Sequence, residues 1–306
     1  MKGRKRAVIS GSVHHIYQRT LNGELIFYTI RDHLVHFSIL SVCAKRHGLT
    51  VLAFCQMPDH LHLTAMPICK KQLADFIRDA TACFVREYNR AVGRTGPLFD
   101  SRFGSAPKIK EKKVRENLVY VYNNAGEREL CSYAEEYRWN FLAYALSAHP
   151  FSEPFVYGKA SWRMKKAVRE AKSRAASGDY LRYNFLERIY AGLDQRETAQ
   201  LTDILVTLYL FIDYQTSIAF YGSFDKMLAA IHSNTGTEHD IREVFDAGTD
   251  RIYAKMSLLI HKLGRYRNIR EVTVASADEK IRLFRLLQEK TGATGRQIAK
   301  FLHMSV

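Results

Sequence analysis

The spacing of hydrophobic residues divides the first half of the chain into short extended segments and longer helical ones. Apolar runs of strand length lie at residues 13–19, 25–28, 49–56, 60–66 and about 103–109. Apolar residues recur with the helical period at residues 34–45, 70–92 and 111–125. This mixture predicts a domain of the α+β class, with Asp32 capping the start of the first helix and His47-Gly48 ending it.

The second half of the chain has a different pattern. Beyond Pro150 the strand signals fade, and helical periodicity continues to the C-terminus. The helical segments are residues 161–175, 197–213, 223–232, 251–264 and 278–290. The sequence therefore predicts two domains, a mixed domain over residues 1–150 and an all-α domain over residues 151–306.

The last segment, about residues 278–304, has the pattern of a helix, a glycine-containing turn and a second helix. This arrangement is typical of a helix-turn-helix, whose second helix would present Arg296, Gln297 and Lys300 to DNA. A packed helical pair with no ligand has the same pattern, so both interpretations stay open.

Composition and charge narrow the class of protein. The 306 residues are 47% hydrophobic and 25% charged, which is typical of a globular protein and excludes a mainly disordered chain. Lys and Arg number 46 against 31 Asp and Glu, a net charge of +15 that favours an acidic polymer as partner. The five cysteines form no C-x-x-C pair, and no apolar run reaches membrane-spanning length, so we expect a cytoplasmic protein.

Two histidines stand one residue apart on a predicted strand. Successive side chains of a strand point to opposite faces, so His60, His62 and Thr64 share one face while Leu61 and Leu63 share the other. The two imidazoles are therefore placed to bind a divalent cation. The alternative is a pair of polar residues on the wet face of a half-exposed sheet.

A third ligand and a reacting group are found on the predicted helix at 111–125. Tyr120 and Asn124 are four residues apart and so lie on the same helix face, whereas Tyr122 has Gly126 four residues on. We therefore prefer Tyr120 as a nucleophile and Asn124 as a metal ligand. A tyrosine that packs at a helix interface is the alternative.

Five motifs in order carry a family resemblance. They are His15–Arg19, Met57–Leu63, Gly93–Phe103, Tyr120–Ala125 and Tyr137–Asn140. Over about residues 11–145 the sequence resembles the HUH single-tyrosine transposases, especially the REP-associated tyrosine transposases. Ala125 departs from the pattern, because the family usually has proline there.

The resemblance implies a ferredoxin-like (RRM-like) catalytic domain over residues 1–150 and a helical accessory domain over residues 151–306. It also implies metal-dependent cleavage and transfer of single-stranded, hairpin-forming DNA. In that reaction His60, His62 and Asn124 hold the metal, and Tyr120 becomes joined to the 5′-phosphate. The oxygen ligands favour Mg²⁺ or Mn²⁺, and the two imidazoles leave zinc and nickel open as alternatives.

Basic residues near the motifs are candidates for binding DNA phosphates. They are Arg19, Arg94, Arg102, Lys108, Lys110, Lys112 and Lys113. His14, His15 and Tyr17 are expected on the same sheet surface as Arg19, without a catalytic role.

Two other functions stay open at this point. A non-catalytic DNA-binding or regulatory protein derived from a transposase would explain the positive charge equally well. A metal-dependent nuclease in which water attacks would leave Tyr120 structural. Both a monomer and a homodimer are compatible with the sequence.

Overall fold

The first half of the chain forms a four-stranded antiparallel sheet with helices on both faces. The computed structural model describes residues 8–100, 103–233 and 249–304. The order of elements is β1 Val13–Arg19, α1 Ile30–His47, β2 Thr50–Gln56, β3 His60–Met66, α2 Lys70–Val92 and β4 Gly104–Lys108. The strand order β2-β3-β1-β4 together with this βαββαβ succession is ferredoxin-like, so the predicted α+β class is confirmed.

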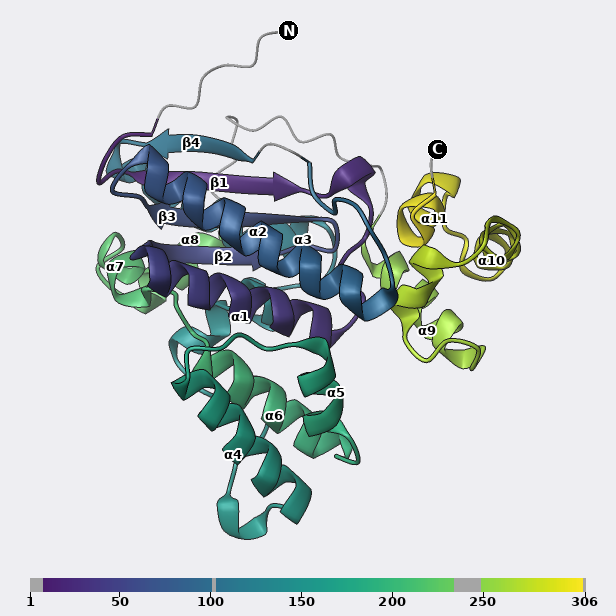
Figure 1. The fold of residues 1–306 in the computed structure, drawn as a ribbon. Coiled ribbons are helices and arrows are strands. Elements are labelled where there is room, and N and C mark those ends of the chain that lie inside the picture. Colours follow the sequence, from purple (N-terminus) through teal and green to yellow (C-terminus); the bar gives the residue numbers. More distant parts are fainter. Residues whose placement is uncertain (1–7, 101–102, 234–248, 305–306) are drawn as a thin grey trace, which may run out of the picture.

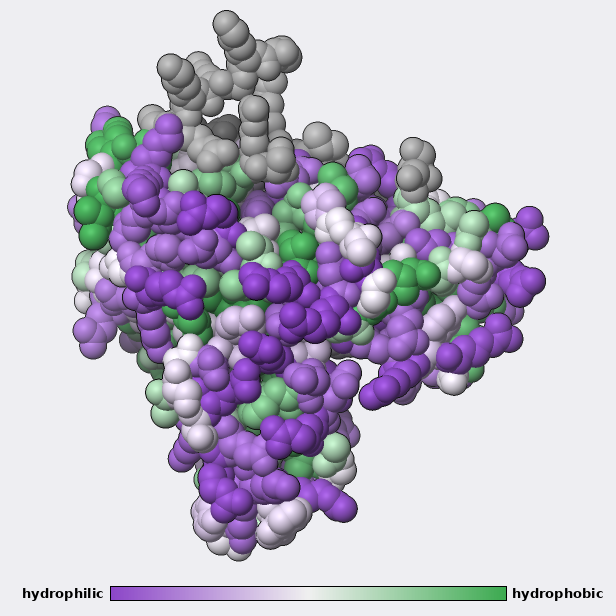
Figure 2. Space-filling view, in the orientation of Figure 1, coloured by the Kyte–Doolittle hydropathy of each residue, from purple (hydrophilic) through white to green (hydrophobic). Residues whose placement is uncertain are grey.

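Two helices cover one face of the sheet and a third covers the other. α1 and α2 pack side by side in front of the strands (Figure 1). Leu61, Leu63 and Ala65 of β3 lie in the hydrophobic cluster beneath them. The outer surface of this face is mainly hydrophilic (Figure 2). The third helix, α3 Glu111–Glu127, packs against β2, β3 and β4 from behind.

The register of β1 against β3 decides which side chains meet under α3. His15 is opposite Thr64, Tyr17 is opposite His62, and Arg19 is opposite His60. Because paired residues project from the same face, these six side chains share the surface that α3 covers. The hydroxyl of Thr64 donates to Oδ1 of Asn117 on α3 at 2.9 Å, which agrees with this orientation.

Local capping explains the ends of α1. Thr29 is the N-cap, and Asp32 is the third helical residue of a capping box, accepting from the backbone N–H of Thr29 at 2.7 Å. The prediction that Asp32 caps this helix is therefore right about the residue's role and wrong about its position. Gly48 ends the helix in the left-handed conformation, with φ of 61°.

The predicted strand at residues 25–28 does not form. The N–H of Leu25 donates to the carbonyl of Lys300, and the N–H of Ile26 donates to that of Pro58. These backbone groups are satisfied by a helix end and a turn rather than by a neighbouring strand. A 3₁₀ turn at Leu21–Gly23 precedes the segment.

The described residues of the second half form helices and no strand. They are α4 Trp162–Ala176, α5 Tyr183–Tyr190, α6 Gln195–Leu208, α7 Tyr214–Ala219, α8 Phe224–His232, α9 Arg251–Lys262, α10 Ala277–Thr291 and α11 Gly295–Leu302. The pattern did not predict α5 or α7. The predicted helix at 197–213 ends earlier, and Ile212 instead forms an isolated bridge with Val51 of β2.

These helices pack in three places around the first half (Figure 1). α4, α5 and α6 form a layer that shares the main hydrophobic cluster with α1. α8 packs against α3. α9, α10 and α11 form a separate cluster at the end of the sheet, together with Leu25 and Tyr28. In the part of the chain that the structure describes, no helix has the length and hydrophobicity needed to span a membrane.

Candidate active site

Three histidines and a tyrosine gather between the sheet and α3. Nε2 of His15 and Nδ1 of His62 are 3.0 Å apart in a hydrogen bond. The ring of Tyr120 is edge-on to both, with centroid distances of 5.4 Å to His15 and 5.3 Å to His62. His60 and His62 are 5.0 Å apart by ring centroid. The alternation of β3 and one face of α3 together produce this cluster.

Asp59 holds His60 in one orientation. Nδ1 of His60 is 2.6 Å from Oδ1 of Asp59. Burial acts to raise the pKa of Asp59, but the neighbouring His60, Lys300 and Arg128 lower it to about 2. Asp59 is therefore an anion at neutral pH and accepts a hydrogen bond from the Nδ1–H of His60. That bond leaves Nε2 of His60 as the acceptor nitrogen.

The structure separates the two neighbouring tyrosines of α3. Tyr120 faces the histidines, and its ring is 5% exposed. Tyr122 is fully buried on the other side of the helix, where its hydroxyl donates to the carbonyl of Leu52 at 3.5 Å. Asn124 is buried one turn beyond Tyr120, and its amide nitrogen donates to the carbonyl of Tyr120 at 2.8 Å. This bond uses the amide nitrogen of Asn124, so the amide oxygen is the atom of that side chain that could bind a metal ion.

The donors of this cluster fit a divalent cation. Nε2 of His60 is buried and has no hydrogen-bond partner among the described residues. Within the same residues, no three His, Cys, Asp or Glu side chains gather where they could hold a metal ion. A metal bound by the two imidazoles would therefore need a ligand of another type, and an amide oxygen such as that of Asn124 would be one.

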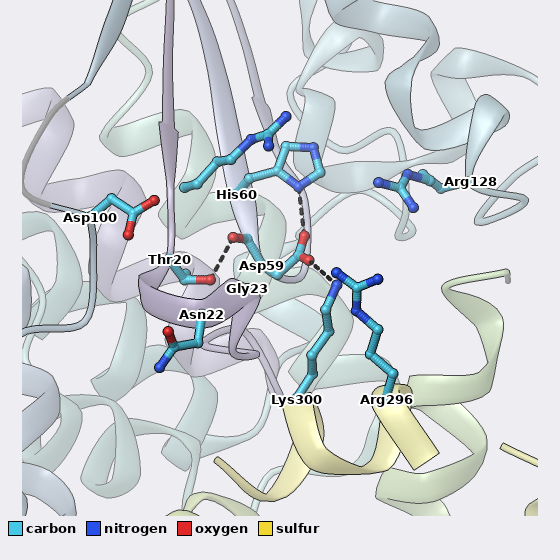
Figure 3. A pocket seen from close by; sticks show the side chains of 10 residues that line it. Thr20, Asn22, Gly23, Asp59, His60, Asp100, Arg128, Arg296 and Lys300 are labelled. Carbon is cyan, nitrogen blue, oxygen red and sulfur yellow. Dashed lines mark hydrogen bonds and ion pairs between the residues drawn. The ribbon is translucent and has the colours of Figure 1, made fainter. Parts of the chain in front are cut away.

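A cavity of about 350 Å³ opens beside His60, at the end of the sheet where α11 packs. Arg19, Arg128, Arg296 and Lys300 contribute four cations to its wall, against the carboxylates of Asp59 and Asp100. Arg296 and Lys300 extend from α11 toward Asp59, while Arg128 lies to one side of Asp59 and His60 (Figure 3). This arrangement suits an anion next to the histidine cluster.

The other predicted basic residues lie in different settings. Lys110, Lys112 and Lys113 are exposed at the start of α3, although Lys113 pairs with Glu116 at 2.8 Å. Arg94 braces its own loop by donating to the carbonyl of Pro97 at 3.0 Å. Lys108 is only 2% exposed, so its side chain is not available on the surface to bind DNA, contrary to the prediction. Arg102 lies outside the described residues.

The second helix of the predicted helix-turn-helix faces the half of the chain that contains the sheet. Nζ of Lys300 is 3.5 Å from Oδ2 of Asp59. Gln297 is 7% exposed and completes the capping box of α11, its side-chain oxygen accepting from the N–H of Thr294. Of the three residues predicted to face DNA on this helix, Arg296 is the exposed one.

Sequence reasoning missed three residues of the site and misplaced one. His15, Asp59 and Arg128 were not assigned a role, although strand alternation and the Pro58-Asp59-His60 sequence were available signals for the first two. No sequence signal pointed to Arg128. His14 was expected beside His15, but it lies on the opposite face of β1, and its Nε2 is 3.1 Å from the carbonyl of Ile9.

Comparisons with known proteins give a weak likeness to a solved structure. No protein-family model matches the sequence, and no curated protein matches it. A solved structure of a REP-associated tyrosine transposase bound to a REP hairpin is similar over 45% of this chain and 81% of that chain. The two chains are 17% identical, and the TM-score is 0.39. Values this low say nothing about function.

Proposed function

We propose that this protein is a metal-dependent single-tyrosine DNA strand transferase that cleaves single-stranded DNA through a covalent bond to Tyr120. The observation that carries the proposal is the contact of the Tyr120 ring with His15 and His62, next to the acceptor nitrogen of His60. The five ordered motifs of the sequence support the same activity.

The chemistry assigns each residue a role. The phenol oxygen of Tyr120 attacks phosphorus and loses its proton, and a bond forms from that oxygen to the 5′-phosphate. The bond from phosphorus to the 3′-oxygen breaks, and the strand leaves as a 3′-hydroxyl after gaining a proton. His60, His62 and Asn124 would hold a divalent cation, Mg²⁺ or Mn²⁺, which would supply Lewis-acid chemistry at the phosphate. A 3′-hydroxyl of another strand end reverses these steps to complete transfer.

Positive charge around the cluster supports a nucleic-acid substrate. Arg19 lines the cavity beside His60, and Lys110, Lys112 and Lys113 are exposed where α3 begins. The start of α3 follows Lys108, which pairs with Val13 at one end of β1, whereas Arg19 pairs with His60 at the other end. A DNA backbone that contacts both groups would therefore run along the sheet past Tyr120. A hairpin beside the cleavage site follows from the sequence resemblance and belongs to the proposal.

The test is covalent capture of DNA. Labelled single-stranded oligonucleotides from the DNA that flanks the gene are incubated with the protein and Mn²⁺ or Mg²⁺, and SDS-resistant adducts are counted. We expect an adduct that requires metal and is lost in Tyr120→Phe. Tyr122→Phe is the matched control, because it removes a hydroxyl from the same helix at a position that faces away from the histidines, and it should retain the adduct.

Each other outcome identifies another function. Metal-dependent nicking without an adduct, retained in Tyr120→Phe, would mean that water is the nucleophile. Salt-dependent DNA binding with neither nicking nor adduct would mean a non-catalytic DNA-binding or regulatory protein.

A further inference from the structure

The C-terminal helix α11 is fixed against the loop that leads from β1 to α1. The carbonyl of Lys300 accepts from the N–H of Leu25 at 3.1 Å. The carbonyl of Phe301 accepts from the hydroxyl of Tyr28 at 2.6 Å, and Nε2 of His303 is 2.5 Å from the carbonyl of Leu25. These contacts hold the helix at the end of the sheet where His60 lies.

The loop beneath α11 has a shape that admits the Lys300 side chain. Gly23 has φ of 67°, a conformation that favours glycine, and a Cβ at this position would lie 3.0 Å from Cε of Lys300. Nζ of Lys300 reaches Asp59, whose other oxygen binds His60. The Lys300 ammonium and the proposed metal ligand His60 therefore contact the same carboxylate, that of Asp59.

Arg296 lies one turn before Lys300 and lines the same cavity. Its side chain extends in the same direction as that of Lys300 (Figure 3). Arg19 and Arg128 line the cavity as well, so cations from β1, from the end of α3 and from α11 meet beside one proposed metal ligand. Asp59 binds His60 and Lys300. The remaining lining cations, Arg19, Arg128 and Arg296, outnumber the remaining carboxylate, Asp100, so the cavity wall carries an excess of positive charge.

We propose that α11 is one wall of the strand-binding site, where Arg296 and Lys300, together with Arg19 and Arg128, bind the backbone phosphate that neighbours the phosphate attacked by Tyr120. This inference rests on the proposed function and adds a second phosphate subsite to it. The C-terminal helix then acts on the single strand at the reacting centre. It does not read a duplex at a distance, because the side of α11 that carries Lys300 packs on the catalytic half and Gln297 is buried.

The experiment measures binding without chemistry. The full-length Tyr120→Phe protein is titrated with a fluorescent single-stranded oligonucleotide in metal-free buffer, and fluorescence anisotropy gives Kd at several salt concentrations. Arg296→Gln and Lys300→Gln are compared in this background. The controls are Arg282→Gln and Lys290→Gln on α10, where the side chains are 77% and 56% exposed and do not line the cavity.

The salt dependence reports the phosphate contacts. Each contact to a single strand adds about 0.7 to the slope of log K against log salt, which corresponds to roughly a fourfold change in Kd at about 0.15 M salt. We expect the slope of each α11 variant to be smaller by about 0.7 and its Kd to be larger by roughly fourfold. The Kd of each α10 control should change by less than about twofold. Arg296→Gln is the cleaner variant because its side chain is exposed. Melting curves check that Lys300→Gln remains folded.

Other results would overturn the inference. Equal losses in the α10 and α11 variants would mean that only total charge matters. Losses confined to a duplex probe would mean that α11 belongs to a helix-turn-helix. Adduct formation by the parent protein with unchanged binding in the α11 variants would refute this inference alone. Binding that depends on α11 with no adduct would refute the proposed function alone.

Discussion

At the scale of single residues, the orientation of His60 depends on the neighbouring carboxylate of Asp59. Asp59 binds Nδ1 of His60 and thereby fixes which ring nitrogen is available as a ligand. The same carboxylate receives Lys300 on its other oxygen. Without the hydrogen bond to Asp59, the His60 ring would lose this fixed orientation, and its Nε2 would be less basic.

We therefore expect Asp59→Asn to weaken Mn²⁺ binding by about 10- to 100-fold, the usual effect of removing such a partner from a histidine ligand. Isothermal titration calorimetry with the metal alone measures this directly. Asp100→Asn is the control, because Asp100 lines the same cavity and is exposed. Equal weakening in both variants would show that the effect is loss of negative charge from the cavity.

Two buried histidines make the fold sensitive to acid. His33 is stacked between Phe27 and Trp139, and burial lowers its pKa to about 3, although the hydrogen bond that its Nδ1–H donates to the side-chain oxygen of Gln56 acts in the opposite direction. Burial likewise lowers the pKa of His36 to about 3. The ordinary value is 6.5, so both side chains are neutral in the folded protein over a range where the unfolded chain is protonated.

The sign of the pH effect follows from that difference. Below about pH 6.5 the unfolded state takes up protons that the folded state does not. The free energy of unfolding therefore decreases as the pH is lowered from about 6.5 to about 3. Each histidine contributes roughly 1.4 kcal/mol per pH unit. Urea unfolding at a series of pH values should show this slope, and His36→Phe should lose one histidine's share. His149→Gln, at an exposed position, should keep the parent slope; an unchanged slope in His36→Phe would contradict the assignment.

At the scale of elements, the sequence predicted most of what periodicity alone determines. β1 and β3 and the helices α2 and α3 lie at the expected positions, because each has one apolar face. Segment 25–28 has strand-like residues, but its partners are Lys300 and Pro58, which no local pattern reveals. The position of α11 is unpredictable for the same reason, since its contacts are with residues more than 200 positions away.

The pairing of β4 with β1 depends on a glycine under an aromatic ring. Gly104 is opposite Tyr17, and a Cβ on Gly104 would overlap the Tyr17 ring. We expect Gly104→Ala to lower the free energy of unfolding by about 1–3 kcal/mol, measured by chemical denaturation. Gly158→Ala is the control, because nothing lies within 4 Å of its Cβ position. Tyr17→Ala should remove most of the penalty in the double variant, and full additivity of the two substitutions would refute the overlap.

At the scale of the whole molecule, the two halves share their cores. The main hydrophobic cluster includes residues of α1 and α2 together with α4, α5 and α6. Asp203 of α6 accepts hydrogen bonds from the hydroxyls of Tyr144 and Ser152, on both sides of the boundary near residue 150. The division into a catalytic domain over 1–150 and a helical accessory domain over 151–306 remains a proposal, and these contacts predict that the two unfold together.

One buried arginine joins the C-terminal cluster to three distant elements. Arg270 belongs to the 3₁₀ helix Ile269–Val274, and its Nε is 3.3 Å from Oδ1 of Asp32 on α1. Its guanidinium carbon is 3.7 Å from the ring centroid of Tyr183 on α5 and 5.7 Å from that of Tyr88 on α2. Both members of the ion pair are almost fully buried. Removing Arg270 would leave the Asp32 carboxylate with its hydrogen bonds from Tyr28 and Thr29 but without its buried counter-charge.

Arg270→Met should therefore lower the free energy of unfolding by about 3–5 kcal/mol, measured by urea denaturation. Arg282→Met removes the same charge from an exposed position on α10 and should change little. In an Asp32→Asn background the cost of Arg270→Met should shrink, because no buried anion remains to be left unpaired. Equal costs in both backgrounds would mean that Arg270 acts through its packing on Tyr183, and the C-terminal cluster would then be held by ring contacts rather than by charge.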